Sequence, residues 1–295
     1  RIHAQAKLVR VIEGEVLDVA VDLRNNRANG QLAYHFRQLS EYIDAIDFVF
    51  LTSKELDITD FGMFENLVSI EQPNYLINCA AYTKVDKAEQ EEELSVRVNT
   101  LAVENMAKLS KKYGFHLVHF STDFVFGDDN IHFLKEDDET SPLSVYGNTK
   151  LKGEEAIAMY SNSYTIIRTS WVYSYFGANF YNTMIRISKN KTIKVVSDQI
   201  GTPTYAGDLA SFVLDNLDKL ISNKNQIYHY SNEGVASWYD FAVMIMNVND
   251  IDCEVVPITT AEYPTLAVRP KFSVMDKSKI KKDFNISINH WTKSL

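Results

Sequence analysis

The 295-residue chain has few cysteines, no excess of positive charge and no long apolar run. Its two cysteines, Cys79 and Cys253, stand far apart and in no CxxC pattern, which argues against a disulfide framework or a thiolate zinc site and predicts a reducing cytoplasm. The net charge of −9 argues against a nucleic-acid-binding surface, so an anionic ligand would need a local cluster of positive charge or of backbone N–H groups. The sequence also predicts no membrane span and no signal peptide.

From about residue 45 onward, short β-branched or aromatic runs alternate with longer amphipathic stretches. This alternation predicts an α/β fold with a doubly wound parallel sheet. The clearest expected helix covers residues 91–114, where apolar residues recur at three- and four-residue steps and Gly114 suits a C-terminal cap. Ligands of such sheets bind at the carboxyl ends of strands, and polar residues follow three expected strands, at 78–83, 121–123 and 169–171.

A Tyr-x-x-x-Lys pair, Tyr146 and Lys150, stands where a turn is expected to become a helix. Four residues apart on a helix, the two side chains share a face, and a nearby ammonium makes a tyrosine a better acid–base group. Alone, this pair is better explained by an ordinary helix with one aromatic residue and one solvated lysine. The preceding strand ends in Ser121, Thr122 and Asp123, and a hydroxyl there could hydrogen-bond a carbonyl that the tyrosine protonates. Together with two small residues at the end of an earlier strand, Ala80 and Ala81, these features indicate carbonyl reduction.

Two small residues, Ala80 and Ala81, end an earlier expected strand and would let a flat cofactor lie close to the backbone. From about residue 28 to the C-terminus the chain resembles the extended short-chain dehydrogenase/reductases, and among them the family of dTDP-4-dehydrorhamnose reductases. The resemblance implies a Rossmann-type dinucleotide-binding domain at 25–170 and a smaller, mainly substrate-binding lobe at 171–295, some of whose strands and helices return to the main sheet. The stretches that carry the resemblance are ANGQL, LDITD, NCAAYTKVDKAE, VNTLAVENMA, STDFVFGD, SPLSVYGNTKLKGEE, RTSWVY, DQIGTPTYAGDLA and SNEGVASWYDFA.

The resemblance also implies a reaction, hydride transfer from NADPH or NADH to C4 of dTDP-4-dehydro-L-rhamnose, which gives dTDP-L-rhamnose for cell-surface polysaccharides. Tyr146 would donate the proton, Lys150 would lower the pKa of Tyr146 and bind the nicotinamide ribose, and Thr122 would polarise the keto group. Asp123 and Trp171 would contact the sugar together with Thr122 and Tyr146. The residues that would border or support the dinucleotide are Asn29, Gly30, Gln31, Leu32, Asp57, Ile58, Ala80, Ala81, Tyr82, Asn99, Tyr146 and Lys150.

The chain departs from this family at the glycine-rich turn, where Arg27, Gly30 and Ala33 stand at the three glycine positions. Alanine at the third position is compatible with helix–strand packing, whereas a side chain at the first is disfavoured in the tight turn, so cofactor binding by this chain stays open. Residues 1–24 resemble instead a strand pair of dTDP-4-dehydrorhamnose 3,5-epimerase, a cupin-type barrel. We expect a hairpin there, as a fusion remnant or as a substitute first strand.

Thr52, Ser53 and Lys54 follow the strand that would face the adenosine ribose, and the lack of an acid there favours NADPH while leaving NADH possible. His116 and His119 would point to opposite faces of one strand, which favours core positions over shared metal ligation. Mg²⁺ at a dimer contact is associated with some members of the family, but no local spacing supports a metal site here. The resemblance leaves a homodimer open.

Two alternatives compete with a dTDP-sugar reductase. One is a non-catalytic binding protein on the same fold, similar to the regulatory β subunit of methionine adenosyltransferase, which the altered glycine turn favours. The other is a different nucleotide-sugar reductase or an epimerase. Trp171 and the stretch at 198–204 favour the dTDP-4-dehydrorhamnose reductase family, because they resemble its sugar pocket.

Overall fold

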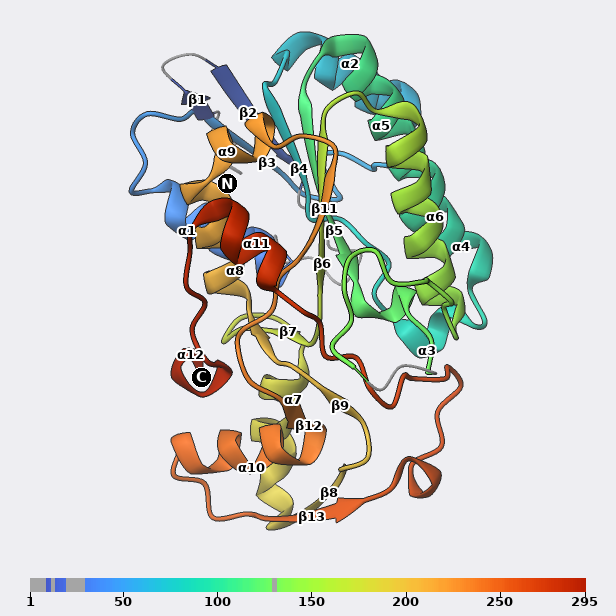
Figure 1. The fold of residues 1–295 in the computed structure, drawn as a ribbon, viewed down its shortest axis with the longest axis vertical. Coiled ribbons are helices and arrows are strands. Elements are labelled where there is room, and N and C mark those ends of the chain that lie inside the picture. Colours follow the sequence, from blue (N-terminus) through green and yellow to red (C-terminus); the bar gives the residue numbers. More distant parts are fainter. Residues whose placement is uncertain (1–8, 12–13, 20–29, 129–131) are drawn as a thin grey trace.

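The computed structural model describes residues 9–11, 14–19, 30–128 and 132–295. Its main sheet has the strand order β1-β2-β4-β5-β6-β11 (Figure 1). From β2 to β11 all neighbouring strands are parallel, whereas β1 is antiparallel to β2. The predicted doubly wound parallel sheet is therefore confirmed. The strands are β1 (Val9–Val11), β2 (Gly14–Val19), β4 (Tyr75–Asn78), β5 (His116–Thr122), β6 (Tyr164–Thr169) and β11 (Gln226–His229), with β3 (Phe48–Leu51) beside β2.

Helices cover both faces of this sheet because its central strands are apolar on both sides. Neighbouring residues of β5 illustrate the alternation: Leu117 packs in the core under one set of helices, and Val118 packs in the core under the other. The first set is α2 (Phe61–Glu71), α5 (Ala102–Tyr113) and α6 (Val145–Tyr160). The second set is α1 (Gln31–Ser40), α8 (Ala206–Asp215), α9 (Leu217–Ser222) and α11 (Ser278–Phe284).

The helix expected at 91–114 is present but changes its winding part-way. It runs as α4 (Glu92–Val96), a π-helical turn (Arg97–Leu101) and α5, and it ends at Gly114, whose φ of 84° is left-handed. The cap is confirmed, because the Gly114 N–H donates to the Ser110 carbonyl and glycine adopts this φ without strain. The π turn was not predicted, since it leaves the apolar periodicity nearly unchanged.

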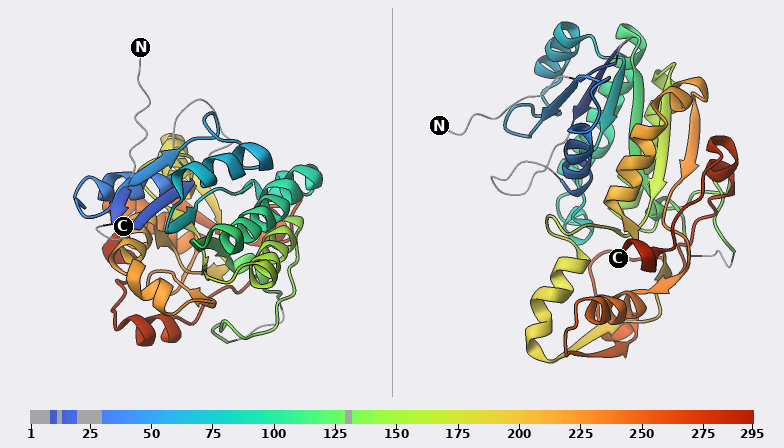
Figure 2. Two further views of the ribbon diagram at one scale, coloured as in Figure 1. Left: turned by 90° about the horizontal axis from the view of Figure 1, so that it is seen from above. Right: turned by 90° about the vertical axis from the view of Figure 1, so that its left-hand side faces the viewer.

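A smaller lobe lies at the carboxyl ends of the sheet strands (Figures 1 and 2). It has its own core, which includes Met184, Ile193, Phe241 and Ile245. The division at residue 171 stays a prediction, although β11, α8, α9 and α11 do return to the main sheet. The elements of the lobe are α7 (Phe180–Ile187), α10 (Trp238–Val248), α12 (Trp291–Ser294) and the strand pairs β7 (Val172–Tyr173) with β10 (Thr204–Tyr205), β8 (Thr192–Val196) with β13 (Glu254–Ile258), and β9 (Ile200–Gly201) with β12 (Ala236–Ser237).

The N-terminal strands join the main sheet. β1 and β2 form an antiparallel pair in which Val11 lies opposite Gly14, and β2 also pairs in parallel with β4. The resemblance of residues 1–24 to an epimerase stays a prediction, as does their role as a substitute first strand. Arg27 and Asn29, on which the altered glycine turn depends, lie outside the described residues. Within residues 9–11, 14–19, 30–128 and 132–295, no helix is long and apolar enough to cross a membrane.

Candidate active site

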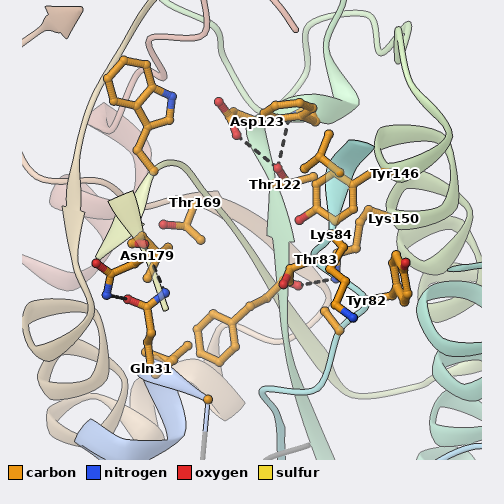
Figure 3. Close-up of a pocket in the computed structure, with 18 of the residues that line it drawn as sticks. Gln31, Tyr82, Thr83, Lys84, Thr122, Asp123, Tyr146, Lys150, Thr169 and Asn179 are labelled. Atoms are coloured by element: carbon orange, nitrogen blue, oxygen red, sulfur yellow. Dashed lines mark hydrogen bonds between the residues drawn. The ribbon is translucent and has the colours of Figure 1, made fainter. Parts of the chain in front are cut away.

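A cavity of about 590 Å³ opens at the carboxyl ends of β4, β5 and β6, between the main sheet and the smaller lobe (Figure 3). Its volume is in the range of small-molecule sites. It brings together most of the predicted site residues, from segments far apart in the sequence. Those that line it are Gly30, Gln31, Leu32, Ala80, Ala81, Tyr82, Thr122, Asp123, Tyr146, Lys150 and Trp171.

Helix α6 carries Tyr146 and Lys150 to the cavity. It begins at Ser144, whose Oγ accepts a hydrogen bond from the Gly147 N–H at 3.1 Å. Gly147 is required at the helix start, because a Cβ there would lie 2.2 Å from the Phe124 carbonyl oxygen. The sequence Ser-Val-Tyr-Gly therefore fixes the helix against the end of β5, and with it the position of the tyrosine.

Tyr146 and Thr122 face each other across the end of β5 (Figure 3). Burial raises the pKa of the Tyr146 hydroxyl to about 12, and a hydrogen bond with Thr122 offsets part of this rise. The Thr122 hydroxyl donates to Asp123 Oδ1 at 3.1 Å and accepts from the Phe124 N–H at 3.2 Å. Burial also raises the pKa of Asp123 to about 6. A tyrosine in this state is protonated at neutral pH and can act as a proton donor.

Lys150 lies directly behind the tyrosine and is only 1% exposed. Its Nζ donates to the Phe120 carbonyl oxygen at 2.6 Å and lies 3.1 Å from His119 Nε2. Burial lowers the pKa of Lys150 to about 8. Burial is the main cause of the raised pKa of Tyr146, and the lowering of that pKa by Lys150, which the resemblance implied, stays a prediction. His119 is a buried residue as expected, but its contact with Lys150 was not predicted.

Asn99 supports the cavity from behind rather than lining it. Its Oδ1 accepts from the Tyr82 N–H at 2.8 Å, and its Nδ2 donates to the Tyr82 carbonyl at 3.1 Å and to Thr149 Oγ1 at 3.2 Å. Asn99 lies in the π-helical turn, a feature often found at functional sites because it changes the direction of a side chain. The side chain thus fixes the loop after β4, which forms one edge of the cavity, to helix α6.

The cavity brings together only some of the residues that were predicted to bind the cofactor. Gly30, Gln31 and Leu32 begin α1, whose first N–H groups have no side-chain cap and face the cavity region. Asp57 and Ile58 do not line the cavity, because Ile58 is buried in the core and Asp57 Oδ1 accepts from the Thr59 N–H at 2.8 Å. The role of these two residues stays a prediction.

The wall opposite Tyr146 is aromatic. Trp171 stacks on Trp238 with ring centroids 3.6 Å apart and an interplanar angle of 9°, and Phe180 lies 4.6 Å from Trp238. Trp171 has a left-handed φ of 47°, and a Cβ on Gly201 would lie 2.7 Å from its ring. Sequence patterns identified Trp171 but not Trp238 or Phe180, because this wall forms only when distant segments of the smaller lobe pack together.

Two cationic side chains at the cavity edge were also missed. Lys84 lines the cavity, as does Arg269, which forms a two-point ion pair with Asp86 at 2.6 and 3.1 Å. The pair connects the short helix α3 (Val85–Ala88) to the C-terminal segment, and a hydrogen bond from Arg269 lowers the pKa of Asp86. No local pattern in the sequence marks Arg269 for this role, because its partner Asp86 lies far away in the chain.

The residues around the cavity bear on the predicted preference for NADPH and on the expected lack of a metal site. Thr52 binds the carboxylate of Glu55 through its N–H and its hydroxyl, both at 2.8 Å, so an acid does lie beside the end of β3. The preference for NADPH argued from Thr52, Ser53 and Lys54 overlooked this acid. In the part of the chain that the structure describes, no three His, Cys, Asp or Glu side chains are placed as metal ligands.

A family model described as the RmlD substrate binding domain matches residues 27–295. The chain belongs to this family. A dTDP-4-dehydrorhamnose reductase from Aggregatibacter actinomycetemcomitans is 40% identical over 278 residues, which cover 91% of this chain and 95% of that protein. The matched region of the RmlD family model thus begins at Arg27 and includes every predicted site residue.

Solved structures of similar proteins agree with this family. A crystal structure of a dTDP-4-dehydrorhamnose reductase from Clostridium acetobutylicum superposes with a TM-score of 0.87 at 36% identity and covers 95% of this chain and 96% of its own. A Bacillus anthracis dTDP-4-dehydrorhamnose reductase in complex with NADP has a TM-score of 0.86 at 35% identity, with the same coverage. The similarity to RmlD-family structures therefore extends over both lobes.

Proposed function

We propose that this chain is a dTDP-4-dehydrorhamnose reductase, which reduces C4 of dTDP-4-dehydro-L-rhamnose with a nicotinamide dinucleotide to give dTDP-L-rhamnose. The observation that carries the proposal is the meeting of Tyr146, Thr122 and Lys150 in one cavity at the carboxyl ends of the sheet strands. Relatives that share at least a third of their residues with this chain bear that enzyme name. Similarity over both lobes supports a nucleotide-sugar reductase over a non-catalytic protein on the same fold.

The cavity suits a dinucleotide. The uncapped start of α1 offers backbone N–H groups to a diphosphate, and Ala80 and Ala81 let a flat ring approach the end of β4. Ser121 Oγ and Thr169 Oγ1, at the ends of β5 and β6, are buried without a hydrogen-bond partner and could bind polar groups of a ligand. NADPH is the proposed cofactor, with NADH possible, and the Bacillus anthracis relative binds NADP. The bound dinucleotide would supply the hydride.

The protein's own groups would supply position, a proton and a hydrogen bond. The Tyr146 hydroxyl, with a pKa of about 12, holds its proton at neutral pH and would pass it to the C4 oxygen. Thr122 would hydrogen-bond the same oxygen as negative charge develops on it. Trp171 and Asp123 would hold the sugar ring between the two walls of the cavity.

The substrate carries a diphosphate, whereas the chain has a net charge of −9. The site would therefore need local positive charge. Lys84 and Arg269 at the cavity edge would supply it, and Arg269 is also held in place by Asp86. This arrangement supports an anionic nucleotide sugar as the substrate.

A homodimer and a cytoplasmic location remain predictions. Light scattering coupled to size-exclusion chromatography would give the mass in solution: twice 33.7 kDa would support the homodimer, and 33.7 kDa would exclude it at that concentration.

Fluorescence titration with NADPH and NADH tests the cofactor half of the proposal. The chain and its Arg27→Gly variant, which restores the first glycine of the turn, would be titrated side by side. The proposal predicts saturable binding by the unmodified chain. Binding only after the glycine is restored would mean that the cofactor site of this chain is disabled.

A further inference from the structure

Three buried polar side chains, of which Asn78 and Lys150 line the cavity, are connected through His119. Asn78 Nδ2 lies 3.0 Å from His119 Nδ1, and His119 Nε2 lies 3.1 Å from Lys150 Nζ. All three residues are at most 1% exposed. Because these groups are buried, they cannot form hydrogen bonds with water instead. Each contact between them therefore needs one donor and one acceptor.

The orientation of Asn78 is fixed at its other end. Its Oδ1 accepts a hydrogen bond from the Ala80 N–H at 3.0 Å, so the amide NH₂ must face His119. An amide NH₂ only donates, and therefore His119 Nδ1 must be an acceptor. Burial holds the pKa of His119 well below 6.5, so the ring is neutral and its single proton is on Nε2.

The Nε2–H of His119 then points at Lys150 Nζ. An ammonium has three N–H donors and no acceptor, so this contact would join two donors. A neutral amine has a lone pair that accepts from Nε2–H, and its own N–H groups still satisfy the Phe120 carbonyl at 2.6 Å. We propose that at mildly alkaline pH His119 holds Lys150 as a neutral amine in the cofactor-free protein, and that Lys150 takes up a proton when the dinucleotide binds at that pH.

The charges around Lys150 are compatible with a neutral amine. On α6, Glu154 raises the pKa of Lys150, but its carboxylate is bound to Arg168 of β6 at 2.7 Å, with both side chains 3% exposed. Three other neighbouring side chains are neutral: Asn78 of β4, His119 of β5 and the protonated Tyr146 of α6. Asp123, which follows β5, is an anion above about pH 6, and its charge acts on the pKa of Tyr146. Burial, which lowers the pKa of Lys150 to about 8, is therefore not overcome by a free carboxylate.

The uptake of a proton rests on the proposed function, because a dinucleotide must bind in the cavity that Lys150 lines. Its diphosphate adds negative charge and its ribose hydroxyls add acceptors, and both favour the ammonium. His119 would then be a positioning residue whose tautomer sets the charge of Lys150. The cation beside Tyr146, and with it the acid–base pair, would be complete only after the cofactor binds.

Nitrogen NMR of the cofactor-free full chain tests the first half. With ¹⁵N-histidine, His119 should appear as the Nε2–H tautomer. With ¹⁵Nζ-lysine, the Lys150 signal, identified by its loss in Lys150→Met, should titrate near about pH 8. An Nδ1–H tautomer, or a Lys150 ammonium that persists to about pH 10, would overturn the inference. Neither measurement requires the protein to be active.

Asn78→Leu provides a matched perturbation that leaves Lys150 in place. Without the amide donor, His119 can adopt the Nδ1–H tautomer and accept from an ammonium, so the titration of Lys150 should move to higher pH. If this variant does not fold, Asn78→Asp is read by the tautomer of His119 alone: its carboxylate accepts from Nδ1–H, whereas its charge would raise the pKa of Lys150 by itself. Thr165→Val is the control, since Thr165 Oγ1 lies 3.0 Å from the other buried histidine of β5, His116. A shift in the control but not in the Asn78 variants would contradict the proposal.

Proton uptake tests the second half. NADPH would be added to the chain in weakly buffered dye solution at about pH 9, where most of Lys150 should be neutral, and uptake should approach about one proton per chain. Lys150→Met should show none. Binding of NADPH without uptake would refute this step. Uptake by a chain that does not reduce the keto sugar would refute the proposed function and leave this inference intact.

Discussion

The two walls of the cavity are built in different ways. The catalytic wall (Thr122, Asp123, Tyr146 and Lys150) lies at the end of β5 and on helix α6. Thr122, Asp123 and Lys150 are buried, and Tyr146 is half-buried. The aromatic wall (Trp171, Phe180 and Trp238) comes from three segments of the smaller lobe that meet only through packing. The first wall is therefore suited to fixed proton positions, and the second to the shape of a ligand.

The largest effect is expected on the catalytic wall, from Tyr146→Phe. Loss of the hydroxyl removes the proton donor, and kcat should fall by about 10²- to 10⁴-fold while nucleotide-sugar binding is largely retained. NADPH oxidation at saturating substrate gives kcat, and calorimetry gives the affinity. Loss of turnover and binding to the same extent would mean that the tyrosine has a structural role.

The second prediction concerns the ionisation of the buried Asp123 carboxyl group in the catalytic wall. Burial raises the pKa of Asp123 from 3.8 to about 6, so the folded protein binds the proton more tightly than the unfolded chain. The resulting stability is present below about pH 4 and is lost as pH rises through about 6. Relative to Asp123→Asn, the wild type should lose up to about 3 kcal/mol of unfolding free energy over this range.

Urea unfolding of both proteins between about pH 4.5 and 7.5 measures this difference. Asp128→Asn is a control at a partly exposed carboxylate that forms an ion pair with Lys271. Parallel curves for wild type and Asp123→Asn would show that the Asp123 carboxylate is better solvated than its position indicates.

The third prediction concerns the aromatic wall. Trp238→Ala removes the ring on which Trp171 stacks, and such pairs contribute about 0.5–1.5 kcal/mol, so KM for the nucleotide sugar should rise by about 2- to 10-fold. kcat should change much less, because the catalytic wall is untouched. The KM of Trp238→Phe, which keeps an aromatic ring, should lie between the values for the wild type and Trp238→Ala. A fall in kcat at constant KM would mean that this wall acts on the reaction itself.

The smallest effect is expected from the ion pair that joins the two sides of the cavity edge. Asp86 and Arg269 are 40% and 23% exposed, and such pairs contribute about 0.2–1 kcal/mol to stability. A double-mutant cycle with Asp86→Asn and Arg269→Gln should give a coupling in this range that shrinks as salt is added. A coupling of several kcal/mol would show that the pair is a main link between the lobes.

The difference between the walls also explains what the sequence could predict. The parallel sheet, the helix ending at Gly114 and the Tyr146–Lys150 helix follow from local periodicity and capping, so they could be predicted. His119 could be placed in the core from its strand position, but its contact with Lys150 depends on the register of α6 against β5. Trp238 and Arg269 could not be found, because their partners lie far away in the chain and no local pattern marks such contacts.

The most direct test of the central claim is the fate of the hydride. The chain would be incubated with dTDP-4-dehydro-L-rhamnose and NADPH carrying deuterium at the transferred position of the nicotinamide, and the product analysed by NMR and mass spectrometry. The account predicts dTDP-L-rhamnose with deuterium at C4, and almost none with Tyr146→Phe. A folded chain that binds both NADPH and the sugar nucleotide but forms no C4-deuterated product would contradict it.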